Sequence, residues 1–497
     1  MKNRKPLWIA IVAVAAVALG ADAQEKYEPT WESLSKVNVA PQWFRDAKFG
    51  IYFHWGTYSV PAFGSEWYPR NMYNVEGREY RHHVETWGEP NAFGYPDFVP
   101  MFKAEKFNAD EWVELFVQAG ARFAGPVAEH HDGWSMWASK LTPWNAAERG
   151  PQRDLTGELA AAVRKRGLKF ITTFHHARNN LWEKPGRDGQ LRWTGHYEFV
   201  KRYFPSLLED PERAIMYGYM PREKFLTMWL GKLQEVIDNY QPDIMWFDSW
   251  LDEIPESLRQ EYVAYYYNQA TRWGKEVVVT RKQNDLPLSV SIEDIEKGRS
   301  DRLTENVWLT DDTISVGSWC YTQDLRIKPT SVVLHSLIDI ISKNGVLLLN
   351  ISPMADGTIP DNQEQVLLEM GEWLRLNGEA VYGTRPWKVY GEGPSQGRAG
   401  QFGGVTDPRG GYKPQDVRFT TKGETLYAIS LGWPDATLTI ESLKAGSPHY
   451  PSEIGSVELI GTDARLAWTR TADGLTIAMP PEKPCDYAVV FKILPKK

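Results

Sequence analysis

Short apolar runs alternate with longer amphipathic stretches from about residue 45 to residue 380. An apolar run of five to seven residues is typical of a strand buried on both faces, whereas apolar residues at helical spacing indicate a helix. Strand-like runs span 49–53, 121–128, 168–174, 243–247, 276–280 and 345–351, and helix-like stretches span 109–119, 156–166, 222–240, 255–273, 329–343 and 361–376. Repeated strand-then-helix units predict parallel strands with helices outside, and the count fits an eight-fold barrel with one or two strands unassigned between residues 281 and 320.

After about residue 385 the helical spacing disappears. Gly- and Pro-rich turns separate short alternating runs at 417–420, 425–430, 437–440, 456–459, 475–478 and 486–491. This pattern is typical of an antiparallel β-sandwich, and residues 391–412 are expected to form an ordered loop or linker. We therefore expect an α/β chain in which a TIM-like (β/α)8 barrel over residues 24–385 precedes a C-terminal antiparallel β-sandwich over residues 386–497.

The first 23 residues have the organisation of a signal peptide. Lys2, Arg4 and Lys5 precede an apolar run at 7–19, and Ala21-Asp22-Ala23 fits the A-x-A cleavage pattern. The run is short for a bilayer span, and a retained anchor is the alternative. We expect cleavage after Ala23, a secreted or periplasmic protein, and no membrane span in the mature chain.

Composition narrows the classes of function. The formal net charge is -8 and no long basic run occurs, which argues against nucleic acid as a partner. The 22 Trp and 23 Tyr suit stacking against the C–H faces of sugars, although most of these rings are expected to fill the core. Cys320 and Cys485 have no metal-binding spacing, and both one long-range disulfide and two reduced thiols stay open. No feature predicts the oligomeric state.

Polar side chains follow five of the predicted strands. The clusters are His54, Glu129-His130-His131-Asp132, His175-His176, Asp248 and Arg281. Because the C-terminal ends of barrel strands meet at one mouth, the five clusters are expected to converge there. A carboxylate among aromatic residues, as Asp248 is, costs free energy to hold near apolar surface. A helix cap or an ion pair would explain Asp248 alone, but five polar strand ends favour a site.

Two kinds of site fit these residues. His54, His130, His131, His175 and Asp248 are all possible metal ligands, but adjacent histidines point to opposite sides of a continuing strand. Carbohydrate hydrolysis needs two carboxyl groups around an anomeric carbon, together with hydroxyl donors and aromatic walls. Asp248 is the first carboxylate, and the candidates for the second are Glu66, Glu293, Glu296 and Glu305. The surrounding tryptophans favour a sugar over a hydrated ion.

Five longer motifs add to this hypothesis. They are residues 48–62 with Glu66-Trp67-Tyr68, residues 130–134 with Trp137 and Ser139, Arg153-Asp154, residues 242–248, and residues 345–353 with Asp356-Gly357. Together they resemble the alpha-L-fucosidases of glycoside hydrolase family 29 over roughly residues 40–390. The resemblance implies a secreted exo-acting retaining enzyme that hydrolyses terminal alpha-L-fucose from fucosylated glycans, without a metal or other cofactor. Another retaining glycosidase on the same barrel, or an inactive carbohydrate-binding relative, is the alternative.

The resemblance also implies a role for each candidate residue. Asp248 would be the nucleophile, and a second carboxyl group would act as acid and then as base. Glu296 is our choice for that group from its Glu-Lys-Gly context, Glu293 is the alternative and Glu305 is third. The residues expected to hold the fucose are His54, Glu66, Trp67, His130, His131, His175, Trp246 and Arg281. His175 stands where the family usually has a tyrosine.

Overall fold

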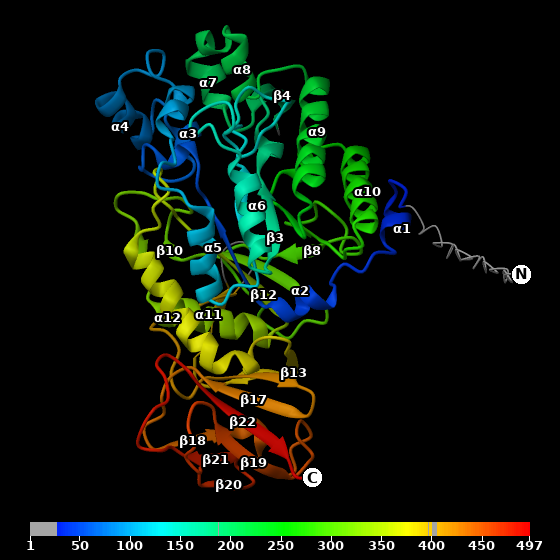
Figure 1. Ribbon diagram of the computed structural model, residues 1–497, viewed down its shortest axis with the longest axis vertical. Coiled ribbons are helices and arrows are strands. Elements are labelled where there is room, and N and C mark those ends of the chain that lie inside the picture. Colours follow the sequence, from blue (N-terminus) through cyan, green and yellow to red (C-terminus); the bar gives the residue numbers. More distant parts are fainter. Residues whose placement is uncertain (1–26, 187, 396, 400–404) are drawn as a thin grey trace, which may run out of the picture.

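The computed structural model describes residues 27–186, 188–395, 397–399 and 405–497, so the predicted signal peptide lies outside the described residues. A helix-covered barrel forms the upper part of Figure 1, and a smaller part built of strands lies below it. Within the described ranges, no helix is long and apolar enough to cross a membrane.

Eight parallel strands close into a barrel in the order β1-β12-β9-β8-β7-β6-β3-β2. Their bounds are β1 Phe49–Phe53, β2 Phe123–Glu129, β3 Lys169–Phe174, β6 Ile244–Phe247, β7 Val278–Arg281, β8 Ile292–Asp294, β9 Trp308–Thr313 and β12 Gly345–Ile351. All six predicted strands are present, and the two unassigned ones are β8 and β9. The predicted (β/α)8 barrel is therefore confirmed.

Alternate residues of these strands fill the inside of the barrel. Tyr52, Ile171, Ile244, Val278 and Ile292 belong to one buried apolar cluster there. Side chains along a strand point to opposite faces in turn, so the inward positions continue at every second residue. At the C-terminal ends of the strands these inward positions carry the polar residues of the site.

Helices cover the outside of the barrel. The longer ones are α5 Ala109–Gln118, α6 Leu155–Lys165, α9 Arg222–Tyr240, α10 Glu256–Arg272, α11 Thr330–Ser342 and α12 Asp361–Asn377, whereas α4 Arg78–Trp87 belongs to the loop after β1 and lies above the barrel (Figure 1). Asn108 caps α5 because its side-chain oxygen accepts hydrogen bonds from the backbone N–H groups of Asp110 and Glu111. Helix α11 is buried along almost its whole length because it lies between the barrel and the C-terminal strands (Figure 1).

Shorter elements extend the loops at both ends of the barrel. They are α1 Trp31–Leu34, α2 Gln42–Ala47, α3 Tyr68–Asn71, the hairpin of β4 Trp182–Pro185 and β5 Leu191–Thr194, α7 Glu198–Tyr203, α8 Pro211–Met216, and the pair β10 Ser315–Val316 and β11 Arg326–Ile327. The loops after β1 and β3 are the longest, and they build the part of the molecule above the barrel in Figure 1.

The C-terminal part consists of two antiparallel sheets. One contains β13 Arg385–Glu392, β16 Val417–Lys422, β17 Thr425–Ser430, β22 Val489–Pro495 and β19 Ile454–Leu459, and the other contains β18 Thr437–Ile440, β21 Leu475–Ala478 and β20 Trp468–Arg470. Phe419 and Phe491 from the first sheet share one apolar core with Leu438 and Ile477 from the second. The predicted sandwich is therefore confirmed. Short strands β14 Arg398–Ala399 and β15 Val405–Thr406 pair within the predicted linker.

A buried cluster of charges joins the two parts. The carboxylate of Asp339 on α11 accepts a hydrogen bond from Nε of Arg418 on β16 at 2.5 Å and one from Nζ of Lys343 at 2.8 Å. Nη1 of Arg299 lies 3.5 Å from the same carboxylate, and its Nη2 donates to Asp407 at 2.5 Å. Buried charges are tolerated only when they are paired in this way.

The two cysteines lie in different parts of the chain. Cys320 is buried next to His54, to which it is joined by a parallel β-bridge, and Cys485 is half-buried in the C-terminal part. Both are free thiols, which decides between the two states left open by the sequence.

Candidate active site

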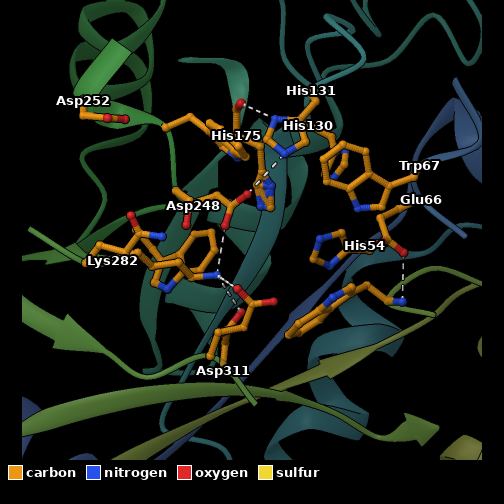
Figure 2. A pocket seen from close by; sticks show the side chains of 16 residues that line it. His54, Glu66, Trp67, His130, His131, His175, Asp248, Asp252, Lys282 and Asp311 are labelled. Carbon is orange, nitrogen blue, oxygen red and sulfur yellow. Dashed lines mark hydrogen bonds and ion pairs between the residues drawn. The ribbon is translucent and has the colours of Figure 1, made fainter. Parts of the chain in front are cut away.

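A pocket of about 410 Å³ opens at the C-terminal ends of the barrel strands (Figure 2). Of the predicted site residues, all except Glu293, Glu305 and Arg281 line this pocket. Sequence reasoning missed the lining residues Ser249, Trp250, Asp252, Lys282, Gln283, Asp311 and Trp319. Four of the five polar strand ends therefore meet at one mouth, and Arg281 is the exception.

Asp248 follows β6 and projects into the pocket. Its Oδ1 accepts a hydrogen bond from Nζ of Lys282 at 2.9 Å, and its Oδ2 lies 3.2 Å from Nε2 of His131. Burial alone would raise the pKa of this carboxyl, but the Lys282 ammonium and the His131 contact outweigh burial and hold the pKa well below its usual range. Asp248 is therefore ionised at neutral pH, as a nucleophile must be.

Lys282 links Asp248 to a second acid. Its Nζ donates to Oε2 of Glu296 at 2.7 Å, so Oδ1 of Asp248 and Oε2 of Glu296 are no farther apart than the sum of the two Lys282 distances. Burial raises the pKa of Glu296 to about 7, with Lys282 opposing this rise and Asp311 and Asp248 adding to it. Near neutral pH Asp248 is therefore ionised whereas Glu296 readily carries a proton, and such a pair suits the roles of nucleophile and general acid.

Neighbouring carboxyl groups keep Lys282 positively charged. Burial alone would lower the pKa of this ammonium, but the neighbouring carboxyl groups raise it well above its usual value. Besides Asp248 and Glu296, Asp311 lies 3.7 Å and Asp294 lies 3.9 Å from Nζ. Lys282 is therefore a fixed cation in the wall of the pocket.

The alternation of side chains along β8 separates the candidate acids. Ile292 and Asp294 of β8 face the inside of the barrel, and Glu296, two residues beyond the strand, bonds Lys282 in the pocket. Glu293 faces outward, and its side chain is 47% exposed. Glu305 is exposed on the loop before β9. Glu296 is thus the one of the three loop candidates that reaches the pocket.

The same alternation along β7 corrects one expectation. Val278 lies inside the barrel, and Lys282, four residues later, therefore reaches the pocket. Arg281 faces the other way: its guanidinium donates to the carbonyl oxygen of Gln283 and lies 3.9 Å from Oε1 of Glu293. Arg281 was expected to contact the substrate, but the position on the pocket wall belongs to Lys282.

Histidines form the inner end of the pocket. Nδ1 of His54 lies 2.7 Å from Oδ1 of Asn350, and because that oxygen accepts, Nδ1 carries the proton and Nε2 is left as an acceptor. Nδ1 of His130 and both ring nitrogens of His175 have no hydrogen-bond partner among the described residues. Burial lowers the pKa of His54 to about 3 and the pKa values of His130 and His175 well below the usual value. These neutral rings are suited to bond hydroxyl groups.

An irregularity in β2 brings two adjacent histidines into the pocket. The pairing of β2 with β3 shifts register between Val127 and Glu129, and the strand ends at Glu129. His130 and His131 both line the pocket because they lie beyond the strand, where strict alternation no longer holds. The expectation that adjacent histidines point to opposite sides held only for a continuing strand, and it does not apply to His130 and His131 because β2 ends at Glu129. The side chain of Glu129 pairs with buried Lys232 at 2.7 Å.

The aromatic walls and Glu66 are held by their own contacts. The Trp67 ring centroid lies 5.3 Å from that of His131, and the Trp246 indole donates to Oδ2 of Asp294 at 3.0 Å. Glu66 accepts the backbone N–H of Trp319 at 3.0 Å, and burial raises the pKa of its carboxyl. These contacts fix the walls before any ligand enters, which favours precise recognition.

Three of the histidines could also surround a metal ion. One ring nitrogen from each of His54, His130 and His175 lies within 4.8 Å of the others. Neutral imidazoles are the form that binds metal, and they are equally the form that bonds sugar hydroxyls. The absence of a metal from the functional site stays a prediction.

Comparisons with known proteins agree with the fold. Residues 14–379 match the family model Alpha-L-fucosidase, and residues 413–494 match the Alpha-L-fucosidase C-terminal domain. The tissue alpha-L-fucosidase of Rattus norvegicus is 31% identical over 495 residues, covering 96% of this chain and 94% of the rat protein. The plasma alpha-L-fucosidase of Homo sapiens is 31% identical over 491 residues, covering 94% and 92%.

A solved structure extends this similarity to three dimensions. The crystal structure of Thermotoga maritima alpha-fucosidase in complex with fucose has a TM-score of 0.73 and 30% sequence identity, covering 94% of this chain and 100% of the Thermotoga chain. The matches span both the barrel and the sandwich, and the pocket lies where barrel enzymes build their active sites. The chain therefore belongs to the alpha-L-fucosidase family.

Proposed function

We propose that this protein is an exo-acting retaining glycosidase that removes terminal alpha-L-fucose from fucosylated glycans or oligosaccharides. The observation that carries this proposal is the single Lys282 ammonium bonded to both Asp248 and Glu296. It sets an upper limit on the separation of Oδ1 of Asp248 and Oε2 of Glu296, and this limit lies near the roughly 5–5.5 Å of retaining glycosidases and below the roughly 6.5–9.5 Å of inverting ones. The fucose in the related Thermotoga structure supports the choice of sugar.

In the first step, ionised Asp248 attacks the anomeric carbon of the fucose. The bond from that carbon to the glycosidic oxygen breaks, and Glu296 gives its proton to the departing oxygen. A covalent ester between Asp248 and fucose remains. The raised pKa of Glu296, about 7, keeps a proton available for this step at neutral pH.

In the second step, Glu296 is a carboxylate and acts as a base. It takes a proton from a water molecule, whose oxygen attacks the anomeric carbon and releases Asp248 as a carboxylate. Lys282 lies beside both acids and stabilises negative charge on Asp248 in the free enzyme and on Glu296 in the intermediate. Two inversions at the anomeric carbon leave its configuration unchanged.

The buried end of the pocket is proposed to hold the fucose ring. His54, His130, His131, His175 and Glu66 supply donors and acceptors for its hydroxyls, and Trp67 and Trp246 form its walls. Because His54, His130 and His175 are buried, the pocket ends there, and a sugar inside it can continue in one direction only. This supports cleavage of terminal rather than internal residues.

A panel of nitrophenyl glycosides tests the proposal. Release is expected from the alpha-L-fucoside, and NMR is expected to show alpha-L-fucose as the first product. Release from another sugar without release from the fucoside would favour a different glycosidase on this barrel, and binding of fucose without any release would indicate an inactive relative. Glu293→Gln, which alters an outward-facing acid, is the control for substitutions in the pocket.

We also propose that the protein is exported, on the strength of the basic residues and apolar run that precede Ala23. N-terminal sequencing of the protein recovered from the periplasm or the medium is expected to begin at Gln24. A chain that stays in the cytoplasm with its first residues intact would contradict this proposal.

A further inference from the structure

The pocket has a buried end and an open rim. The lining residues that are exposed are Trp250, Asp252 and Gln283, which come from the loops that follow β6 and β7. If a terminal sugar fills the buried end, as proposed above, the group attached to it must leave through the rim. The rim residues are therefore the part of the pocket that meets the leaving group.

Trp250 is an exposed aromatic residue in an unfavourable backbone conformation. Its side chain is 38% exposed although it belongs to a residue type that proteins usually bury. Its φ is 82°, in the left-handed region that large side chains seldom adopt. Such conformations are strained and cluster at ligand-binding sites, where the surrounding structure maintains them.

The guanidinium group of Arg178 stacks on the Trp250 ring. The Cζ atom of Arg178 lies 3.7 Å from the centroid of the Trp250 ring and 5.5 Å from that of Trp67. Within the described part of the chain, the Arg178 guanidinium has no hydrogen bond or ion pair, and its buried Nε has no partner. The Arg178 guanidinium therefore contacts the protein by stacking. It covers one face of the Trp250 ring and keeps this ring at the rim.

We propose that Trp250 is the platform of a leaving-group subsite that stacks the apolar C–H face of a pyranose ring next to the cleaved fucose. An aromatic face presents partial negative charge to the C–H groups of a sugar, which makes a pyranose a suitable partner. Asp252 and Gln283 stand at the same rim and are able to bond the hydroxyls of that ring. This inference rests on the proposed function and names the class of leaving group that the pocket prefers: a sugar.

Two substrates separate this role from a general effect on the pocket. Alpha-L-fucosyl fluoride has no leaving-group ring, whereas a fucosylated disaccharide has one. For Trp250→Ala we expect kcat/KM to fall about fivefold to tenfold for the disaccharide and to change less than about twofold for the fluoride. Trp250→Phe keeps a ring and is expected to retain most of the activity on the disaccharide.

Two further variants complete the test: a second variant without the ring and a matched control. Trp250→Gly removes the ring but suits the left-handed backbone, so it reports on stacking even if the alanine variant folds poorly. Leu288→Ala is the matched control, because Leu288 is 47% exposed on the loop after β7 and does not line the pocket. It is expected to leave both substrates unaffected.

Equal losses for both substrates, or no loss for the disaccharide with either the alanine or the glycine variant, would overturn the subsite. A wild-type protein that hydrolyses neither substrate would overturn the proposed function itself, and this outcome is visible before any variant is made. Selective loss for the disaccharide supports the subsite.

Discussion

Nζ of Lys282 lies 2.9 Å from Oδ1 of Asp248, although the two residues follow different barrel strands, β7 and β6. The same ammonium lies 2.7 Å from Oε2 of Glu296. One buried cation thus stands between the proposed nucleophile and the proposed acid, and it stabilises the ionised form of each. The electrostatic state of the pocket depends on this one side chain.

Removal of that cation should change the pH dependence of activity. In Lys282→Met both Asp248 and Glu296 lose the partner that favours their ionised forms, so the pKa of each should rise. Both limbs of the kcat/KM profile on an aryl fucoside should move to higher pH, and kcat/KM at pH 7 should fall at least ~10²-fold. Arg281→Met, which changes the neighbouring cation outside the pocket, should leave the profile in place.

Glu296 should set the alkaline limb of the wild-type profile. Its raised pKa of about 7 belongs to an acid that must be protonated to act, so kcat/KM should fall about tenfold per pH unit above that value. Glu296→Gln should abolish this limb and should slow substrates with poor leaving groups far more than activated aryl fucosides. A limb that persists in Glu296→Gln but disappears in Glu293→Gln would reverse the assignment.

Asp248 should be required for formation of the covalent intermediate. Asp248→Gly removes the nucleophile and should lower kcat on the aryl fucoside more than ~10³-fold. Azide is expected to enter the vacated space, attack from the same face and yield beta-L-fucosyl azide, which NMR identifies. Recovery of alpha-L-fucosyl azide would show that another group still acts as nucleophile.

Asp339 should be essential for stability at the junction of the two parts. Asp339→Asn leaves buried cations, chiefly Arg418 and Lys343, without their partner and should lower the free energy of unfolding by roughly 3–5 kcal/mol in denaturant titrations. Asp46→Asn is the matched control: its pair with Arg385 also joins the two parts but is about one-third exposed, and it should cost about 0–1 kcal/mol.

The contribution of Asp339 should also depend on pH. Burial would raise the pKa of its carboxyl, but Arg418, Lys343 and Arg299 outweigh burial and lower the pKa far below its unfolded value. A group with a depressed folded pKa stabilises above its unfolded pKa, about 3.9, and loses this contribution as the pH falls further. The stability difference between wild type and Asp339→Asn should therefore shrink below about pH 4.

Most strands could be predicted because each is a continuous apolar run. Strands β8 and β9 were not predicted, because β8 has only three residues and β9, Trp308–Thr313, contains Asp311 and Asp312. Asp311 can be buried because its carboxylate accepts a hydrogen bond at 2.8 Å from Tyr52, which lies 259 residues away in sequence. A hydrophobic pattern cannot reveal a strand whose inward residue is polar and satisfied by a distant partner.

The sequence by itself determined the barrel, the sandwich, the family and most residues of the pocket, because apolar spacing and long motifs are local properties of the chain. Only the tertiary structure decided that Lys282, and not Arg281, stands beside Asp248, and that Glu296 faces inward while Glu293 is exposed. Neighbouring residues of a strand point to opposite faces, and which face meets the pocket is fixed only when the barrel closes.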